Sequence, residues 1–163
     1  MNKKKFIKYI ESPVGWLELK ATRDSLTAIS FVDEKGIASN SEPEILVNAA
    51  IQLDEYFKGE RKEFDLNIAP EGTEFQKKVW QFVSEVSFGQ TASYLDIAYR
   101  TGSQKNTRAV GFANGKNPLP IIIPCHRIIG SNGKLTGYAG GLKRKQWLLQ
   151  HELKYSEKAG VLF

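Results

Sequence analysis

Three prolines interrupt the apolar segment 117–127, and they decide what backbone this part of the chain can adopt. Proline has no backbone N–H and a fixed φ angle, so it is excluded from helix interiors and from central strands. We therefore expect a stiff, irregular stretch, such as the wall of a pocket, rather than a regular element. The three residues are Pro118, Pro120 and Pro124.

The same segment ends on the only cysteine of the chain, Cys125, followed by His126 and Arg127. Thiolate is the nucleophilic form of cysteine, and nearby positive charge favours it, so these neighbours predict a low-pKa thiolate. Only His126 and His151 can serve as an imidazole base, and Glu152 beside His151 allows a Cys–His–Glu relay. The plainer alternative is a buried cysteine that acts as a small hydrophobe.

Charge is distributed unevenly along the 163 residues, whose formal net charge is +5. Residues 1–72 hold ten Lys and Arg against thirteen Asp and Glu, whereas residues 73–163 hold thirteen against five. A basic C-terminal half suits a polyanion such as nucleic acid. A solvated basic face without a partner is the alternative.

Composition removes several classes of protein. One cysteine cannot form an internal disulfide, and one cysteine with two histidines disfavours a structural zinc site. No apolar run reaches the length of a bilayer, and no apolar signal core follows the basic start at residues 1–6. We therefore expect a cytoplasmic protein with no metal and no membrane association, and nothing indicates an oligomer, so we expect a monomer.

Hydrophobic patterning predicts two domains, at residues 1–70 and 73–163, separated by a short break where the sign of the charge changes. The first domain is expected to be a small sheet with one helix. Its predicted strands are 6–12, 14–20, 26–32 and 63–68, and its predicted helix is 43–57.

The second domain is predicted to be mainly helical, with Thr73 and Ser93 as N-caps. Two short helices joined by a tight turn fit a helix-turn-helix, in which the second helix enters a DNA groove. That second helix begins with Arg108, although many short helical pairs bind nothing. A hairpin is expected at Asn132-Gly133. The predicted helices are 74–87, ended by Phe88-Gly89-Gln90, then 94–100, 107–115 and 142–153.

Taken together, these motifs resemble the O6-alkylguanine-DNA alkyltransferases, also called methylated-DNA–protein-cysteine methyltransferases. The central match is Asn117-Pro118-x-Pro120 followed by Pro124-Cys125-His126-Arg127, and the likeness covers nearly all of 72–152. The resemblance implies an α/β (α+β) fold, with a ribonuclease-H-like N-terminal domain and a winged-helix-like second domain. The other matching segments are Gly72-Thr73-x-Phe75-Gln76, Phe88-Gly89, Ser93-Tyr94, Arg108-Ala109-Val110-Gly111, Tyr138-x-Gly140-Gly141-Leu142 and Trp147-Leu148-Leu149.

The resemblance also implies a reaction. Cys125 would take the alkyl group from guanine O6 irreversibly, once per molecule and without a cofactor. Its thiolate would be prepared through His126, a water and Glu152, while Asn117 would support the pocket. The substrate would be double-stranded DNA containing O6-alkylguanine, with O4-alkylthymine left open.

Further roles in DNA binding follow from the same resemblance. Tyr94 would donate to the base and contact a phosphate, and Arg108 would fill the space of the extruded base. The backbone carbonyls of Cys125 and Ile128 would accept from the guanine amino group. The remaining expected substrate or DNA contacts are Asn114, Arg127, Tyr138, Ala139 and Gly140. Two of these depart from other members, since Ala139 replaces a serine and Asn114 an apolar residue.

Other interpretations stay open at this point. Arg108 binding only a phosphate is a commoner role than intercalation, and Tyr94 at a helix start is equally consistent with packing. A lesion-binding module without transfer is one alternative function, although such relatives lack the cysteine. A cysteine hydrolase and a plain helix-turn-helix regulator are the others.

Overall fold

The computed structural model describes residues 4–156, so residues 1–3 of the basic start and residues 157–163 of the second predicted domain lie outside the described part. The chain divides into two compact units between Glu71 and Gly72.

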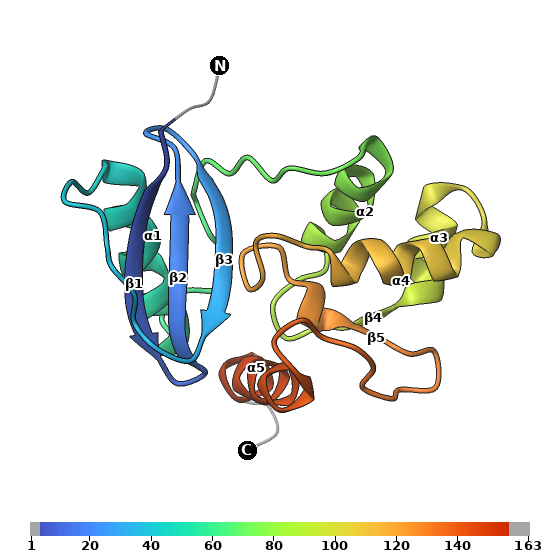
Figure 1. Ribbon diagram of the computed structural model, residues 1–163. Helices are drawn as coiled ribbons and strands as arrows, with labels where there is room; N and C mark the ends of the chain where they lie inside the picture. Colours follow the sequence, from blue (N-terminus) through green and yellow to red (C-terminus); the bar gives the residue numbers. More distant parts are fainter. Residues whose placement is uncertain (1–3, 157–163) are drawn as a thin grey trace. The chain divides into compact units, whose positions relative to one another are not determined.

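The first unit is an antiparallel sheet in the order β1-β2-β3 with one helix, α1, across one of its faces (Figure 1). The alternation that predicted the strands reflects burial, because Leu17, Leu19 and Ala21 of β2 are all buried. The elements are β1 (Phe6–Ser12), β2 (Gly15–Ala21), β3 (Leu26–Val32) and α1 (Glu44–Phe57).

The predicted strand at 63–68 is wrong. This segment is irregular and makes only an isolated parallel bridge between Ile68 and Leu26. Its two backbone hydrogen bonds with β3 are Leu26 N–H donating to Asn67 O and Ala69 N–H donating to Leu26 O, each at 2.9 Å. A single bridge ties the segment to the edge of β3 without extending the sheet.

The second unit holds four α-helices and a two-stranded parallel pair, β4-β5, in its described residues (Figure 1). Its interior is built by α2, α3 and α4, and the indole of Trp80 on α2 donates to Ala113 O at 2.8 Å. The elements are α2 (Glu74–Ser84), β4 (Ala92–Ser93), α3 (Tyr94–Thr101), α4 (Thr107–Gly115), β5 (Ile128–Ile129) and α5 (Leu142–Tyr155).

Capping explains where these helices start. Thr73 and Ser93 each form a full capping box. The hydroxyl of Thr73 accepts from the backbone N–H of Gln76, whose side chain accepts from the backbone N–H of Thr73, and Ser93 pairs with Asp96 in the same way. Gly102 ends α3 with φ of 119°, a left-handed conformation that glycine adopts without strain. The turn to α4 then completes the predicted helix-turn-helix.

Two details of the second unit differ from expectation. Helix α2 ends at Ser84 rather than near Phe88, because a turn at 87–90, with Gly89 at φ of 79°, already redirects the chain. The Asn132-Gly133 turn forms, yet the hairpin prediction is wrong because β5 pairs in parallel with β4. Within residues 4–156, no helix combines the length and apolar character needed to cross a membrane.

Candidate active site

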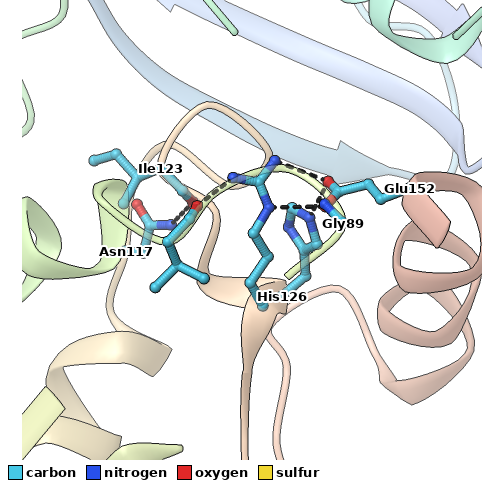
Figure 2. A network of polar contacts seen from close by, with 7 residues as sticks. Gly89, Asn117, Ile123, His126 and Glu152 are labelled. Carbon is cyan, nitrogen blue, oxygen red and sulfur yellow. Dashed lines mark hydrogen bonds and ion pairs between the residues drawn. The ribbon is translucent and has the colours of Figure 1, made fainter. Parts of the chain in front are cut away.

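The wall that precedes Cys125 is irregular and rigid, as the prolines predict. Asn117 holds it in place, since its Nδ2 donates to Ile123 O at 2.8 Å (Figure 2). Its Oδ1 also accepts from Leu119 N–H at 2.9 Å. Ile121 has φ of 76°, which is a strained conformation for a β-branched residue and costs of the order of 1–3 kcal/mol. The two hydrogen bonds of Asn117 stabilise the strained backbone around Ile121.

Cys125 opens a short 3-10 helix, Cys125–Arg127, and its side chain is buried. Burial raises the pKa of the Cys125 thiol to about 11, although a hydrogen bond from Asn117 and the positive charge of Lys145 act in the opposite direction. The prediction of a low-pKa thiolate is therefore wrong for the free protein. The adjacent residues fail to supply the expected charge because their side chains are engaged elsewhere.

His126 is fully buried and faces Glu152, with His126 Nε2 and Glu152 Oε2 2.6 Å apart (Figure 2). Burial lowers the pKa of His126 more strongly than Glu152 raises it, so the imidazole is neutral near pH 7. A neutral ring that donates from Nε2 has an acceptor at Nδ1. Nδ1 has no partner among residues 4–156, so it is the atom of this ring able to take a proton.

Arg127 is also drawn into this network. Its guanidinium donates to both carboxylate oxygens of Glu152, at 2.8 and 3.0 Å, and to Val86 O at 2.7 Å. The Gly89 N–H adds a fourth donor to Glu152 at 3.2 Å (Figure 2). Arg127 is 6% exposed, so the expectation that it contacts DNA is wrong, and it orients Glu152 instead.

The carboxylate of Glu152 stays ionised in this buried position. Burial alone would raise its pKa, but the hydrogen bond from His126, followed by the hydrogen bonds and charge of Arg127, holds the pKa well below its ordinary value. Glu152 therefore fixes the tautomer of His126 and stabilises any positive charge that the ring acquires. The structure pairs His126 with Glu152 across to α5, whereas the relay from Cys125 to His126 stays a prediction.

Sequence reasoning missed Lys145, which is fully buried on α5. Its Nζ donates to the carbonyls of Ile128 at 2.6 Å and Thr136 at 2.7 Å and lies 5.8 Å from the centre of the Tyr94 ring. Burial lowers the pKa of Lys145 to about 8, and the negative charge of an ionised Cys125 opposes this shift. Helical spacing offered a signal, because Lys145 lies three and seven residues before the buried Leu148 and Glu152.

The residues expected around the base lie on three other segments. Tyr94 is the first residue of α3, and its hydroxyl accepts from Thr136 Oγ1 at 3.2 Å. Tyr138 has a buried hydroxyl, and burial raises its pKa well above its ordinary value. Ala139 is exposed in the same loop, whereas Gly140 is buried and its carbonyl accepts from Arg144 at 3.0 Å.

Helix α4 brings the last two predicted residues to the site. Arg108 is exposed at its start, where a long cation can reach a ligand. Asn114 is buried near its end and donates from Nδ2 to Cys125 O at 3.2 Å. His151 stacks on Trp147 with the ring centres 4.8 Å apart, so it packs there, which leaves His126 as the candidate base.

The fold and the site describe a protein with a helix-turn-helix whose second helix adjoins a buried cysteine backed by a histidine–glutamate pair. Two family models match the chain: the 6-O-methylguanine DNA methyltransferase ribonuclease-like domain over residues 5–70 and the DNA binding domain of the same family over residues 74–154. The chain belongs to the 6-O-methylguanine DNA methyltransferase family.

Individual relatives agree with this assignment. A methylated-DNA–protein-cysteine methyltransferase of Methanosarcina acetivorans is 47% identical over 149 residues, covering 87% of this chain and 94% of the relative. The constitutive enzyme of that name from Bacillus subtilis is 45% identical, covering 91% and 96%. The solved O6-methylguanine methyltransferase of Mycobacterium tuberculosis has a TM-score of 0.84 at 40% identity, covering 94% and 95%. A structure of the Mycobacterium tuberculosis protein in complex with DNA has the same TM-score at 41% identity, covering 92% and 94%. The predicted mixed α/β fold is confirmed.

Proposed function

We propose that this protein repairs DNA by transferring the alkyl group of O6-alkylguanine to Sγ of Cys125, once per molecule and without a cofactor. Family membership and the names of the relatives support the reaction class. The observation that carries the assignment of residues is the turn Cys125–Arg127, in which a buried cysteine is followed directly by a histidine held by Glu152. This is the arrangement of a nucleophile, a base and a group that orients the base.

The transfer is a single displacement. The Cys125 proton moves to Nδ1 of His126, directly or through a water, and Glu152 stabilises the resulting imidazolium. The sulfur then attacks the alkyl carbon, a C–S bond forms, and the electron pair of the broken C–O bond stays on guanine. The Tyr94 hydroxyl supplies the proton that neutralises the departing base. A thioether is stable to water, so the protein is used once.

Charge near the sulfur decides how readily the thiolate forms. The shift from 9.0 to about 11 makes ionisation of Cys125 about 3 kcal/mol harder than for an exposed thiol. Lys145 and Asn117 act against this shift, and Lys145 also holds the loop around Thr136 through its carbonyl. We assign both as positioning residues that favour the reactive form of Cys125.

The second unit carries the DNA contacts in this proposal. The target atom lies inside a duplex, so the nucleotide must be flipped out, which costs a few kcal/mol. Arg108 enters the space left by the base, and the excess of basic residues in 73–163 neutralises phosphates. The carbonyls of Cys125 and Ile128 already accept from Asn114 and Lys145. Each carbonyl oxygen has a second lone pair for the guanine amino group.

The remaining parts of the proposal concern the whole chain. Residues 1–70 form the ribonuclease-like domain, and residues 73–163 form the domain that binds DNA and accepts the alkyl group. The protein acts as a monomer in the cytoplasm, where a reduced thiol persists. Analytical ultracentrifugation with and without duplex DNA tests the monomer directly.

The reaction is tested with a duplex oligonucleotide that contains one O6-methylguanine. We expect the intact mass of the protein to rise by one methyl in place of hydrogen, on Cys125 in the peptide map, with one event per molecule. Cys125→Ser is the control and is expected to retain lesion binding without any gain in mass. Tight lesion-specific binding by the unmodified wild-type protein would instead identify a recognition module.

Two other results would replace the proposal. Repeated turnover of a small ester by the wild-type protein would identify a cysteine hydrolase. Equal affinity for damaged and undamaged duplexes, with no change in mass, would leave a helix-turn-helix regulator.

A further inference from the structure

Asn114 is the only polar side chain among the buried residues of α4. Its Nδ2 donates to the backbone carbonyl of Cys125 at 3.2 Å, and the side chain is 4% exposed. This contact settles which way the amide is turned, because the opposite orientation would place Oδ1 against another oxygen acceptor. Oδ1 is therefore the amide atom that does not face the Cys125 carbonyl.

Oδ1 of Asn114 has no hydrogen-bond partner among the described residues, and it is buried. A buried acceptor without a donor costs about 1–3 kcal/mol. An apolar side chain would fill the same space on α4 without that cost, and native proteins carry few such groups without a functional reason. The free acceptor belongs to the same amide that contacts the backbone of Cys125, so it lies beside the residue that carries the nucleophile.

We propose that Oδ1 of Asn114 reads the flipped base by accepting a hydrogen bond from the exocyclic 2-amino group of guanine. O6-alkylation removes the proton from guanine N1, so N1, N3, N7 and O6 are all acceptors. The 2-amino group is then the only N–H donor left on the base, and of its two N–H bonds one would donate to Oδ1 and the other to a backbone carbonyl of Cys125 or Ile128. This inference rests on the proposed function and names the residue that sets its preference among bases.

The same chemistry predicts which bases are disfavoured. O4-alkylthymine has acceptors at O2 and N3 and no N–H donor, so it leaves Oδ1 unpaired in a dry site. O6-methylhypoxanthine differs from O6-methylguanine only by lacking the 2-amino group, which makes it the matched probe. A neutral hydrogen bond contributes about 1 kcal/mol, so loss of this one corresponds to a change of roughly five- to tenfold in rate.

The test combines two proteins with two substrates. Second-order rates of methyl transfer are measured for the wild type and for Asn114→Leu, on duplexes containing O6-methylguanine or O6-methylhypoxanthine. We expect the variant to lose roughly five- to tenfold on O6-methylguanine and little on O6-methylhypoxanthine, so that the wild-type preference narrows by that factor. Asn106→Leu removes an amide whose Nδ2 donates to Thr101 Oγ1, and it is expected to leave the preference intact.

Several results would overturn the inference. Equal slowing of Asn114→Leu on both substrates would mean that Asn114 acts only through the Cys125 carbonyl. If the wild type shows no preference for the base with a 2-amino group, the inference also fails, and this comparison does not depend on whether a variant folds. If neither base alkylates Cys125, the proposed function fails. The affinities of Cys125→Ser for the two duplexes then test Asn114 separately, with equal affinities counting against it.

Discussion

The pKa of the Cys125 thiol in the DNA-free protein is the most direct test of the site. Burial raises its pKa to about 11 from an ordinary value of 9.0. A shift of two units means roughly a hundredfold less thiolate at neutral pH and about 3 kcal/mol more to form it. The free protein should therefore behave as a protonated, slowly reacting thiol, despite the histidine and arginine that follow it in the sequence.

Alkylation by iodoacetamide at a series of pH values measures this directly, because only the thiolate reacts. Since the pKa of Cys125 is raised to about 11, the rate should keep climbing through neutral pH and show no plateau below about pH 9. Restricted access to a buried sulfur lowers every rate but does not change the shape of the profile. A plateau that begins near pH 7 would refute the reasoning and restore the low-pKa thiolate. Protein unfolded in urea is the control and should titrate near the ordinary value.

A substitution of Lys145 should change the pH dependence of Cys125 alkylation. Its positive charge lowers the pKa of Cys125, so Lys145→Met should slow alkylation at pH 7. The pKa of Lys145 is itself lowered to about 8, so the charge is lost as the pH rises through that value. The wild type and the variant should then converge above about pH 9. The exposed neighbour Lys143 gives the matched control, Lys143→Met, and an equal effect of both variants would exclude a specific role for Lys145.

Three further predictions concern stability and DNA. Glu152→Gln leaves Arg127 buried without a counter-charge and should lower the free energy of unfolding by about 3–5 kcal/mol in urea. Because the folded pKa of Glu152 is depressed, its contribution is present above its ordinary value of 4.5 and is lost as the pH falls through the lower folded value. The variant should therefore unfold with a weaker dependence on acid, and an unchanged acid profile would contradict this. Arg108→Ala should slow repair in a duplex more than reaction with free O6-benzylguanine, whereas equal slowing would remove the intercalation argument. Thr73→Ala should cost about 1 kcal/mol in thermal unfolding through loss of the capping box, and a change below a few tenths would contradict that role.

Local signals in the sequence predicted the elements that local forces build. The caps Thr73 and Ser93 placed the starts of α2 and α3, and the three prolines placed the irregular wall before Cys125. In each case the determining interaction lies within a few residues, so spacing and residue type are enough. The strand predicted at 63–68 failed because a lone segment becomes a strand only when a neighbour pairs along its length.

The directions of the side chains around Cys125 could not be predicted from the sequence. The two side chains that follow Cys125 bond a partner far away in the sequence. His126 and Arg127 both contact Glu152 on α5, which is 26 and 25 residues further along the chain. Lys145 reaches the site only because α5 buries the face that carries it. Tertiary packing decides these directions. Because His126 and Arg127 are adjacent to Cys125 in the sequence, they were expected to place positive charge near its sulfur, and that expectation is wrong.

A buried, protonated thiol suits a protein whose only cysteine is alkylated irreversibly in a single reaction. At neutral pH the raised pKa of Cys125 reduces its reaction with stray electrophiles about a hundredfold. The energy needed to ionise it is then part of the barrier to transfer, and the hydrogen bond from Asn117 and the charge of Lys145 reduce that energy. Because Asn114 contacts the carbonyl of Cys125 and, in our proposal, the base itself, recognition of guanine and exposure of the sulfur to its target occur at the same wall of the pocket.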